Sequence, residues 1–190
     1  GIGGYVLYEK AGELVVQFTG AEPMELPPTR YTPVEEEQFR ARLDAFAKGL
    51  AAGEPSVPLV LKGEDLNMLL ASNPDLATFA KGVRLKVEGD EIHGIVSLKL
   101  GDLGAPFFRD RYLNGEASFQ VELEDGRLSV RPSRIVVNGE PLPAESLAAL
   151  REQNLAEGVN RNPDLQATLK KLERIEVRDG AVRVVPKDSP

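Results

Sequence analysis

The stretch Asn73-Pro74-Asp75-Leu76, which returns as Asn162-Pro163-Asp164-Leu165, is the clearest indication of how this chain folds. Asparagine caps the first turn of a helix and proline fits the first helical position, so each stretch predicts a helix start. Predicted elements in the same order surround both stretches. We therefore interpret residues 59–100 and 144–186 as two copies of an approximate repeat, with a chance match of the four residues as the alternative.

Each copy is predicted to contain two short helices followed by a hairpin. In the first copy, a helix over Glu64–Ala71 leads into the first stretch, and a strand at Val83–Val87 follows the second helix. In the second copy, the helices cover Glu145–Glu157 and Leu165–Leu172, and the first strand begins at Arg174. The order of elements is thus the same in both copies.

Alternating apolar and polar residues predict further strands between the copies, at Ala117–Leu123, Leu128–Val130 and Ile135–Val137. Residues that tolerate a positive φ separate the strands, which favours hairpins. These turn pairs are Gly89-Asp90, Asn114-Gly115, Asp125-Gly126, Asn138-Gly139 and Asp179-Gly180. The pattern predicts an α+β fold, with a mostly antiparallel, curved β-sheet and helices packed on one face.

A proline-rich stretch and a capped helix precede the repeat. Four prolines between residues 20 and 33 predict an extended linker. We therefore divide the chain into an N-terminal segment with this linker, 1–32, and a single α+β domain, 33–190. Residues 32–35 have the pattern of a capping box, and apolar residues then recur at helical spacing up to Leu50, which predicts a helix.

The composition is that of an ordinary folded chain of 190 residues with a formal net charge of −7. Thirty acidic residues against 23 basic ones create a field that repels phosphate backbones, which disfavours general nucleic-acid binding. The chain has no cysteine, so disulfides, thiolate metal sites and a cysteine nucleophile are excluded. We predict no cofactor and no metal.

The one histidine, His93, does not predict a metal site or a catalytic triad. Zinc normally requires further imidazole or thiolate ligands, and the chain has neither a second histidine nor a cysteine. Glu88, Asp90 and Glu91 cluster at a tight turn but lack the spaced oxygen ligands of a calcium loop. No serine stands in a nucleophile elbow, and spacing alone pairs none with His93. The expected roles are structural.

Three carboxylates represent the enzymatic alternative. Glu122 and Glu124 are two residues apart in a predicted strand, so both side chains point from one face, as in a glycosidase pair. Asp110 is a third candidate. Alternation with Val121 and Leu123 equally explains the pair as the polar face of a strand, so we assign no catalytic residue. A carboxylate-dependent hydrolase or carbohydrate-active enzyme remains the alternative function.

The stretch 105–115 is the candidate binding site, because it combines aromatic side chains and two arginines in a predicted loop. Paired arginines also bind carboxylate or phosphate groups. The alternative is structural: the phenylalanines close one end of the sheet, and the arginines pair with acidic side chains. The candidate residues for a ligand or partner are Phe107, Phe108, Arg109, Arg111, Tyr112 and Asn114.

The sequence opens on Gly1-Ile2-Gly3-Gly4 without an initiator methionine, which suggests that an upstream segment was removed. Tyr5, Tyr8 and Lys10 suit the exit from an excised anchor or signal segment, with a tag remnant as the alternative. No uninterrupted apolar run exceeds four residues, far short of the about 20 that a spanning helix requires.

Three stretches resemble a group of uncharacterised bacterial proteins, namely Leu61–Leu70, Arg111–Ala117 and Val137–Pro143. The resemblance extends over about residues 5–185 in the order of elements. In that group a transmembrane or signal segment precedes an extracytoplasmic α+β domain of unknown function. The resemblance implies a membrane-anchored location and no established activity. This sequence departs from the group in having no anchor-like stretch, which is what we expect of a trimmed extracytoplasmic domain.

These features together predict a non-enzymatic, extracytoplasmic binding or structural module, anchored to a bacterial membrane in the full-length protein. Its expected partner is a protein or a hydrophobic small molecule, and not a nucleic acid. A carrier of hydrophobic molecules needs an apolar cavity between sheet and helices, whereas a scaffold has a filled core and an exposed apolar patch. The presence of a cavity therefore discriminates between these two roles.

Overall fold

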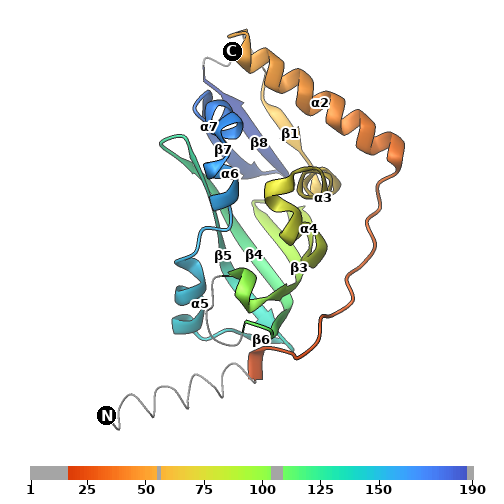
Figure 1. The fold of residues 1–190 in the computed structure, drawn as a ribbon, viewed down its shortest axis with the longest axis vertical. Helices are drawn as coiled ribbons and strands as arrows, with labels where there is room; N and C mark the ends of the chain where they lie inside the picture. Colours follow the sequence, from red (N-terminus) through yellow and green to blue (C-terminus); the bar gives the residue numbers. More distant parts are fainter. Residues whose placement is uncertain (1–16, 55–56, 104–108, 188–190) are drawn as a thin grey trace.

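The computed structural model describes residues 17–54, 57–103 and 109–187. Its helices pack against two antiparallel sheets (Figure 1). The α-helices are α2 (Pro33–Ala51), α3 (Gly63–Ser72), α4 (Ala77–Gly82), α5 (Ala144–Arg151), α6 (Glu157–Arg161) and α7 (Pro163–Leu169), and the 3-10 turns are η1 (Pro74–Leu76) and η2 (Leu100–Leu103).

The strands divide into a larger sheet, in the order β2-β3-β4-β5-β6, and a smaller sheet, in the order β1-β8-β7. All neighbouring pairs are antiparallel, so the predicted α+β class with antiparallel strands is confirmed. The strands are β1 (Leu59–Leu61), β2 (Val83–Glu88), β3 (Glu91–Lys99), β4 (Tyr112–Glu124), β5 (Arg127–Val137), β6 (Glu140–Pro141), β7 (Leu172–Arg178) and β8 (Ala181–Pro186).

A side chain that occupies the outer edge of β2 explains why the strands do not form one continuous sheet. The side chain of Asn67, on α3, accepts the N–H of Leu85 at 2.8 Å and donates to the carbonyl of Leu85 at 3.0 Å. It thereby supplies the hydrogen bonds that a further strand would make at this edge. The hairpin β7–β8 pairs instead with β1, where Leu59 lies opposite Val184.

Helix α2 begins where the capping pattern predicts. Thr32 Oγ1 accepts the N–H of Glu35 at 3.2 Å, and Pro33 is the first helical residue. Phe39 and Leu50 are buried, and the helix packs over the smaller sheet. The predicted cap and the predicted apolar face therefore agree with the structure.

The predicted turns are correct except for one. Asp125, Asn138 and Asp179 have positive φ angles, and each precedes a glycine that also has a positive φ. Asn114-Gly115 is a wrong prediction, because both residues lie inside β4. A Cβ atom at Gly115 would lie 2.3 Å from the carbonyl oxygen of Val136, so glycine permits the close approach of β5.

The helix predicted over Glu145–Glu157 is interrupted, since α5 ends at Arg151 and α6 starts only at Glu157. Asn154 is the cause. Its side-chain oxygen accepts the N–H of Val130 at 2.9 Å, and the next residue, Leu155, donates its own N–H to the Val130 carbonyl at 3.0 Å. These bonds to β5 replace helical ones.

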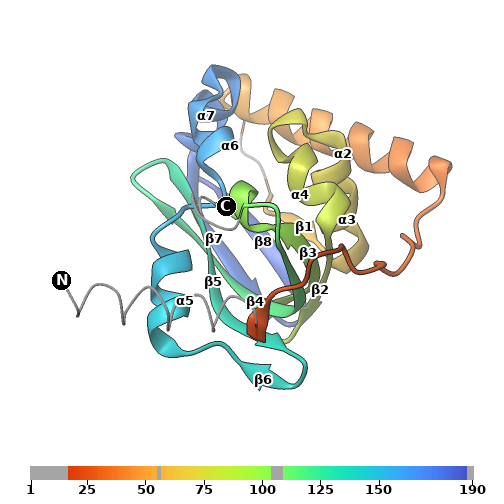
Figure 2. The ribbon, with the colours of Figure 1, turned by 60° about the horizontal axis from the view of Figure 1, so that its bottom comes forward.

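The proline-rich segment is extended and packs along the larger sheet (Figure 2). Gly20 and Tyr112 form an antiparallel bridge with two backbone hydrogen bonds of 2.8 Å. Phe18 is 6% exposed and belongs to the core. The N–H of Met24 donates to Ser97 Oγ at 2.9 Å. Residues 18–24 are therefore fastened to the domain.

The core consists of three apolar clusters. One lies on the inner face of the larger sheet around Val96, which is 1% exposed. A second joins α2 and α3 to the smaller sheet, and a third lies under α6 and α7. The turns of the two hairpins also meet, because the N–H of Gly180 donates to the carbonyl of Gly89 at 2.9 Å. The space between the two sheets and the helices is where the first candidate site lies.

Candidate functional site

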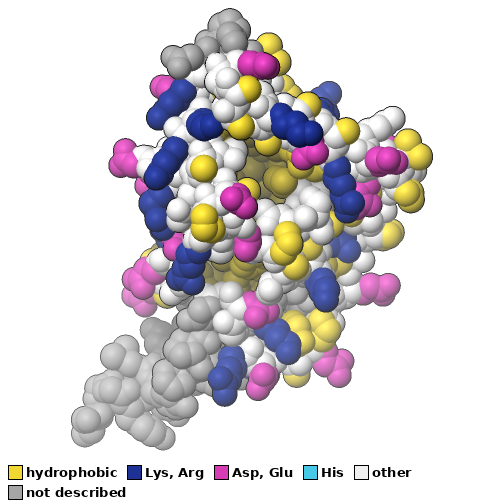
Figure 3. Space-filling model, turned by 45° about the horizontal axis from the view of Figure 1, so that its top comes forward, with side chains coloured by type: hydrophobic (Ala, Val, Ile, Leu, Met, Phe, Trp, Pro, Cys, Tyr) yellow, Lys and Arg dark blue, Asp and Glu magenta, His cyan; other side chains and the backbone are white. Residues whose placement is uncertain are grey.

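An apolar cavity of about 200 Å³ lies between the two sheets and the short helices. All 19 residues that line it are Leu, Val, Ile, Phe or Ala. Helices α3 and α4 with η1 form one wall, β5 and the residues before α6 form the opposite wall, and strands of both sheets lie between them. Figure 3 shows hollows with hydrophobic floors on this end of the molecule. The cavity therefore offers an apolar surface that solvent can reach.

Two asparagines connect the walls of the cavity to the larger sheet by hydrogen bonds, one to strand β2 and the other to strand β5. Asn67 bonds both backbone groups of Leu85 on β2, as described above. Asn160, which is 1% exposed, accepts the N–H of Leu128 on β5 and donates to the carbonyl of Leu128, both at 2.8 Å. Leu85 and Leu128 both line the cavity. These amide hydrogen bonds, together with the apolar packing around them, thus set the positions of the walls.

The two Asn-Pro-Asp-Leu stretches meet at the cavity. Nδ2 of Asn162 donates to Oδ2 of Asp75 at 2.9 Å. Each asparagine also caps its own helix: Asn73 Oδ1 accepts the N–H of Asp75 at 2.9 Å, and Asn162 Oδ1 accepts the N–H of Asp164 at 3.0 Å. The caps confirm the predicted helix starts at both stretches.

The contact between the stretches joins the opposite walls. Leu76, next to Asp75, lines the cavity from η1, and Ala156 lines it from the other side. A Cβ atom at Gly158 would lie 3.1 Å from the carbonyl oxygen of Asp75, so α6 approaches η1 closely. We name this contact, formed by Asp75, Gly158 and Asn162, the bridge.

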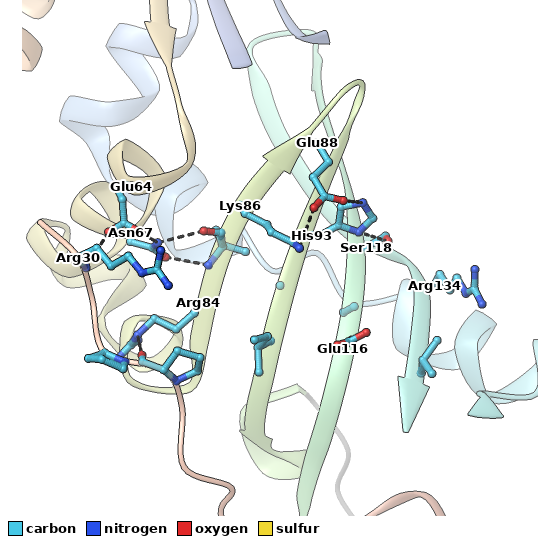
Figure 4. A pocket seen from close by; sticks show the side chains of 17 residues that line it. Arg30, Glu64, Asn67, Arg84, Lys86, Glu88, His93, Glu116, Ser118 and Arg134 are labelled. Atoms are coloured by element: carbon cyan, nitrogen blue, oxygen red, sulfur yellow. Dashed lines mark hydrogen bonds and ion pairs between the residues drawn. The ribbon is translucent and has the colours of Figure 1, made fainter. Parts of the chain in front are cut away.

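A second, polar groove of about 490 Å³ lies on the outer face of the larger sheet (Figure 4). Four residues in register across four strands form a row along it, namely Lys86 on β2, His93 on β3, Ser118 on β4 and Arg134 on β5. Because side chains alternate along a strand, their neighbours point to the opposite face, toward the core and the cavity. The sheet therefore separates the groove from the cavity.

Glu88 is the acidic group at one end of the groove. Its carboxylate lies 2.7 Å from Lys86 Nζ and 3.5 Å from His93 Nε2. The hydrogen bond from Lys86, with its charge, holds the pKa of Glu88 below the usual range, and the same bond raises the pKa of Lys86. Both side chains are exposed, so this pair shapes the local charge and adds little to stability.

Ser118 and His93 form a pair that spacing along the sequence did not predict. Ser118 Oγ lies 3.0 Å from His93 Nδ1, and His93 Nε2 lies 3.2 Å from Glu91. Serine, histidine and carboxylate in this order are the elements of a hydrolytic triad. Ser118 is only 8% exposed, however, and its hydrogen bond holds the histidine ring in the groove. The pair could not be predicted without the register of β3 and β4, which places Ser118 opposite His93.

Of the candidate residues at 107–114, Phe107 and Phe108 lie outside the described residues. Arg109 is exposed in a turn. Arg111 donates from Nε to Thr19 Oγ1 at 2.6 Å and from Nη2 to the Thr19 carbonyl at 2.9 Å. The Arg111 guanidinium is thus engaged with the N-terminal segment.

Tyr112 and Asn114 hold the same segment. Tyr112 pairs with Gly20 through two backbone hydrogen bonds, and Lys99 Nζ lies 5.7 Å from the centre of the Tyr112 ring. Asn114 donates to the carbonyl of Glu22 at 2.9 Å and accepts from Ser97 Oγ at 2.7 Å. The structure therefore brings Arg111, Tyr112 and Asn114 together around residues 19–24. A role in binding a partner stays a prediction.

The carboxylates of the enzymatic alternative do not meet in a cleft. Glu122 and Glu124 are exposed on β4, and Asp110 is exposed in a turn. None of the three lines the cavity or the groove. Among the described residues, no group of three or more His, Cys, Asp or Glu side chains is arranged to hold a metal ion.

No protein-family model, curated protein or solved structure matches this chain. The predicted resemblance to membrane-anchored bacterial proteins stays a prediction. In the part of the chain that the structure describes, no helix is both long and apolar enough to span a bilayer. The function is therefore inferred from the geometry of the cavity and the groove.

Proposed function

We propose that this protein is a non-enzymatic binding module that holds a hydrophobic ligand, such as a single acyl chain, in the cavity between its two sheets and short helices. The observation that carries the proposal is the lining of the cavity, in which all 19 residues are apolar. Of the two partners expected from the sequence, a protein or a hydrophobic small molecule, a cavity of this kind favours the small molecule.

The size of the cavity suits an apolar molecule rather than ordered water. Water is held in order only by polar partners, and the lining side chains provide none. An engineered apolar cavity of roughly 150 Å³ in another protein stays dry and binds benzene. The cavity in this chain is larger, at about 200 Å³. A ligand that fills it regains the contacts that the lining atoms lack.

The walls are positioned before a ligand arrives, which favours binding. Asn67 holds α3 to β2, and Asn160 holds α6 to β5, each through two hydrogen bonds to one backbone residue. A preorganised site loses less conformational entropy when it binds. The lining also has no group that attacks a substrate or transfers a proton, so its chemistry is binding.

The ligand class agrees with the location expected from the sequence. We propose that the full-length protein is anchored to a bacterial membrane outside the cytoplasm, where acyl chains are abundant. Fractionation of cells that express the full-length product tests this location. Recovery of the protein in the cytosolic fraction would contradict the location without affecting the ligand.

The ligand itself is tested by titration with cis-parinaric acid, a fatty acid that fluoresces in apolar surroundings. Val130 on β5 lines the cavity, so Val130→Phe should fill part of it. Loss of burial for two methylene groups raises Kd by about tenfold or more. Val136→Phe is the matched control, because Val136 lies on the same strand but lines the outer groove.

Both variants should keep the circular dichroism of the native protein. The proposal is supported if the native chain binds saturably, Val130→Phe weakens that binding and Val136→Phe leaves it unchanged. Absence of saturable binding by the native chain, or equal losses in the two variants, would refute it.

A further inference from the structure

The polar groove contains an arginine that is fixed in place and has no carboxylate partner among the described residues. Arg84 donates from Nε to the carbonyl of Pro27 at 2.8 Å and from Nη1 to the carbonyls of Ala80 and Val83 at 3.0 Å. Neutral backbone groups hold the guanidinium without neutralising its charge. A ligand that binds it would therefore meet a preorganised cation.

Arg30 lines the same groove from the N-terminal segment. Its backbone N–H donates to Glu64 Oε2 at 3.1 Å, but within 17–54, 57–103 and 109–187 its guanidinium has no hydrogen-bond or ion-pair partner. Figure 4 shows both arginines at the β2 side of the groove. Like charges that line one groove repel each other unless an anion lies between them. The two guanidinium groups therefore fit an acid group of a ligand.

The charge of the groove differs from that of the whole chain. Four Arg or Lys side chains and three glutamates line it, whereas the chain carries a net charge of −7. Glu88 is paired with Lys86, whereas Glu64 accepts from the neutral amide of Asn67 at 3.3 Å and keeps its charge, so three arginines and two glutamates remain. The basic excess is thus local to the groove and concentrated on its arginines.

The remainder of the groove offers groups that bind hydroxyls. The exposed carboxylate of Glu116 accepts hydrogen bonds, and the Ser118–His93 pair adds a hydroxyl and a ring nitrogen. The volume of about 490 Å³ lies within the range of sites for small organic molecules, roughly 300–1,000 Å³. The lining contains no Phe, Tyr or Trp side chain, so recognition here rests on hydrogen bonds and charge.

We propose that the groove binds a small hydroxylated molecule that carries a phosphate or a carboxylate group. The acid group lies between Arg30 and Arg84, and the hydroxyl groups lie over Glu116 and Ser118. Guanidinium groups bind both kinds of acid through paired, charge-assisted hydrogen bonds. The larger sheet separates this site from the apolar cavity, so the two proposals stand or fall independently.

Isothermal titration calorimetry with three sugars tests the site. Glucose, glucuronate and glucose phosphorylated on its primary hydroxyl share one ring and differ in the acid group. Glucuronate or the phosphorylated sugar should bind at least about tenfold more tightly than glucose, and rising salt should weaken that binding. Whichever of the two acidic sugars binds more tightly shows whether the site prefers a carboxylate or a phosphate. No binding by either acid, or equal binding of glucose, would overturn the proposal.

Arg30→Gln is the sharpest variant, because the Arg30 side chain holds no other described part of the fold. It should weaken binding of the acidic sugar by about tenfold. Arg84→Gln should do the same, although it also loses the bonds to the carbonyls of Pro27, Ala80 and Val83. Arg40→Gln, on the exposed face of α2, is the control and should leave binding unchanged. An equal effect of Arg30→Gln and Arg40→Gln would show that only general charge attracts the sugar, which overturns the proposal.

Discussion

Asn162 in the second Asn-Pro-Asp-Leu stretch donates a hydrogen bond from Nδ2 to Oδ2 of Asp75 in the first, at 2.9 Å. The two copies of the motif thus contact each other directly, and they do so where opposite walls of the apolar cavity meet. Whatever the origin of the approximate repeat, its two helix starts form one structural feature. That feature, the bridge, is open to a direct test.

Asp75→Ala should cost less stability than Asn162→Ala. Among the described residues the Asp75 carboxylate bonds only Asn162, and Asp75 is exposed, so its loss should lower the free energy of unfolding by under about 1 kcal/mol. Asn162→Ala also removes the cap of α7 and should cost about 1–2 kcal/mol. Urea denaturation measures both values. Equal losses would contradict separate roles for the cap and the bridge.

Joining the two sides of the bridge should leave ligand uptake unchanged, because the cavity is open to solvent and its walls are already in position. The native chain has no cysteine, so Asp75→Cys with Asn162→Cys introduces the only two thiols, one on each wall. A short bifunctional maleimide that joins them prevents the walls from separating at this point. Stopped-flow fluorescence should then show uptake of cis-parinaric acid at the same rate as in the variant whose thiols are not joined.

The control joins two thiols within α2, in Asp44→Cys with Lys48→Cys, and should leave the uptake rate unchanged. Uptake that is about tenfold slower in the joined bridge variant alone would contradict a preorganised, open cavity, because it would show that the walls must separate before the ligand enters.

Local features of this fold were predictable from the sequence, because each depends on a few neighbouring residues. Thr32 caps α2 through the N–H of Glu35, three residues away. Asp179 and the following glycine provide the positive φ angles that reverse the chain between β7 and β8. Propensities of this kind do not require knowledge of the rest of the molecule.

The candidate sites were not predictable in the same way, because they depend on contacts between distant residues. Asn67 gave no signal of pairing with Leu85, 18 positions later in the chain. Ser118 meets His93 only through the register of β3 and β4. The cavity requires packing of both sheets against the short helices. A sequence pattern indicates which residues are apolar but not where their packing leaves a space.

Asn67→Ala and Asn160→Ala should expose different backbone amides. Asn160 is the described acceptor for the N–H of Leu128, so Asn160→Ala leaves that partly buried group without this acceptor and should cost about 1–3 kcal/mol. Hydrogen exchange should show protection of the Leu128 amide falling by about tenfold or more relative to neighbouring amides. In Asn67→Ala the Leu85 amide should lose protection instead, since it donates to Asn67.

Each of these two variants is the control for the other. Loss of protection at both amides in either variant would indicate that the walls open together. It would contradict the view that Asn67 and Asn160 hold their walls to β2 and β5 independently of each other.

Lys86→Gln should raise the pKa of Glu88. The hydrogen bond and charge of Lys86 hold this pKa low, so the pair favours the folded state above the ordinary glutamate pKa. That contribution is lost as the pH falls through the lowered value. Carbon NMR titration of the carboxyl group measures the change. The pKa of Glu176, which Arg174 lowers, should stay unchanged in Lys86→Gln. A shift at Glu176, or none at Glu88, would contradict this assignment.

The central claim is that an acyl chain occupies the cavity, and nuclear Overhauser effects between isotope-labelled decanoate and the protein test it most directly. The methylene protons of decanoate should give cross-peaks to the methyl groups of Leu69, Leu128 and Ile175, which line the cavity from three different elements. Cross-peaks confined to exposed methyl groups such as those of Val34 and Val57, which are 62% and 72% exposed, would contradict the claim.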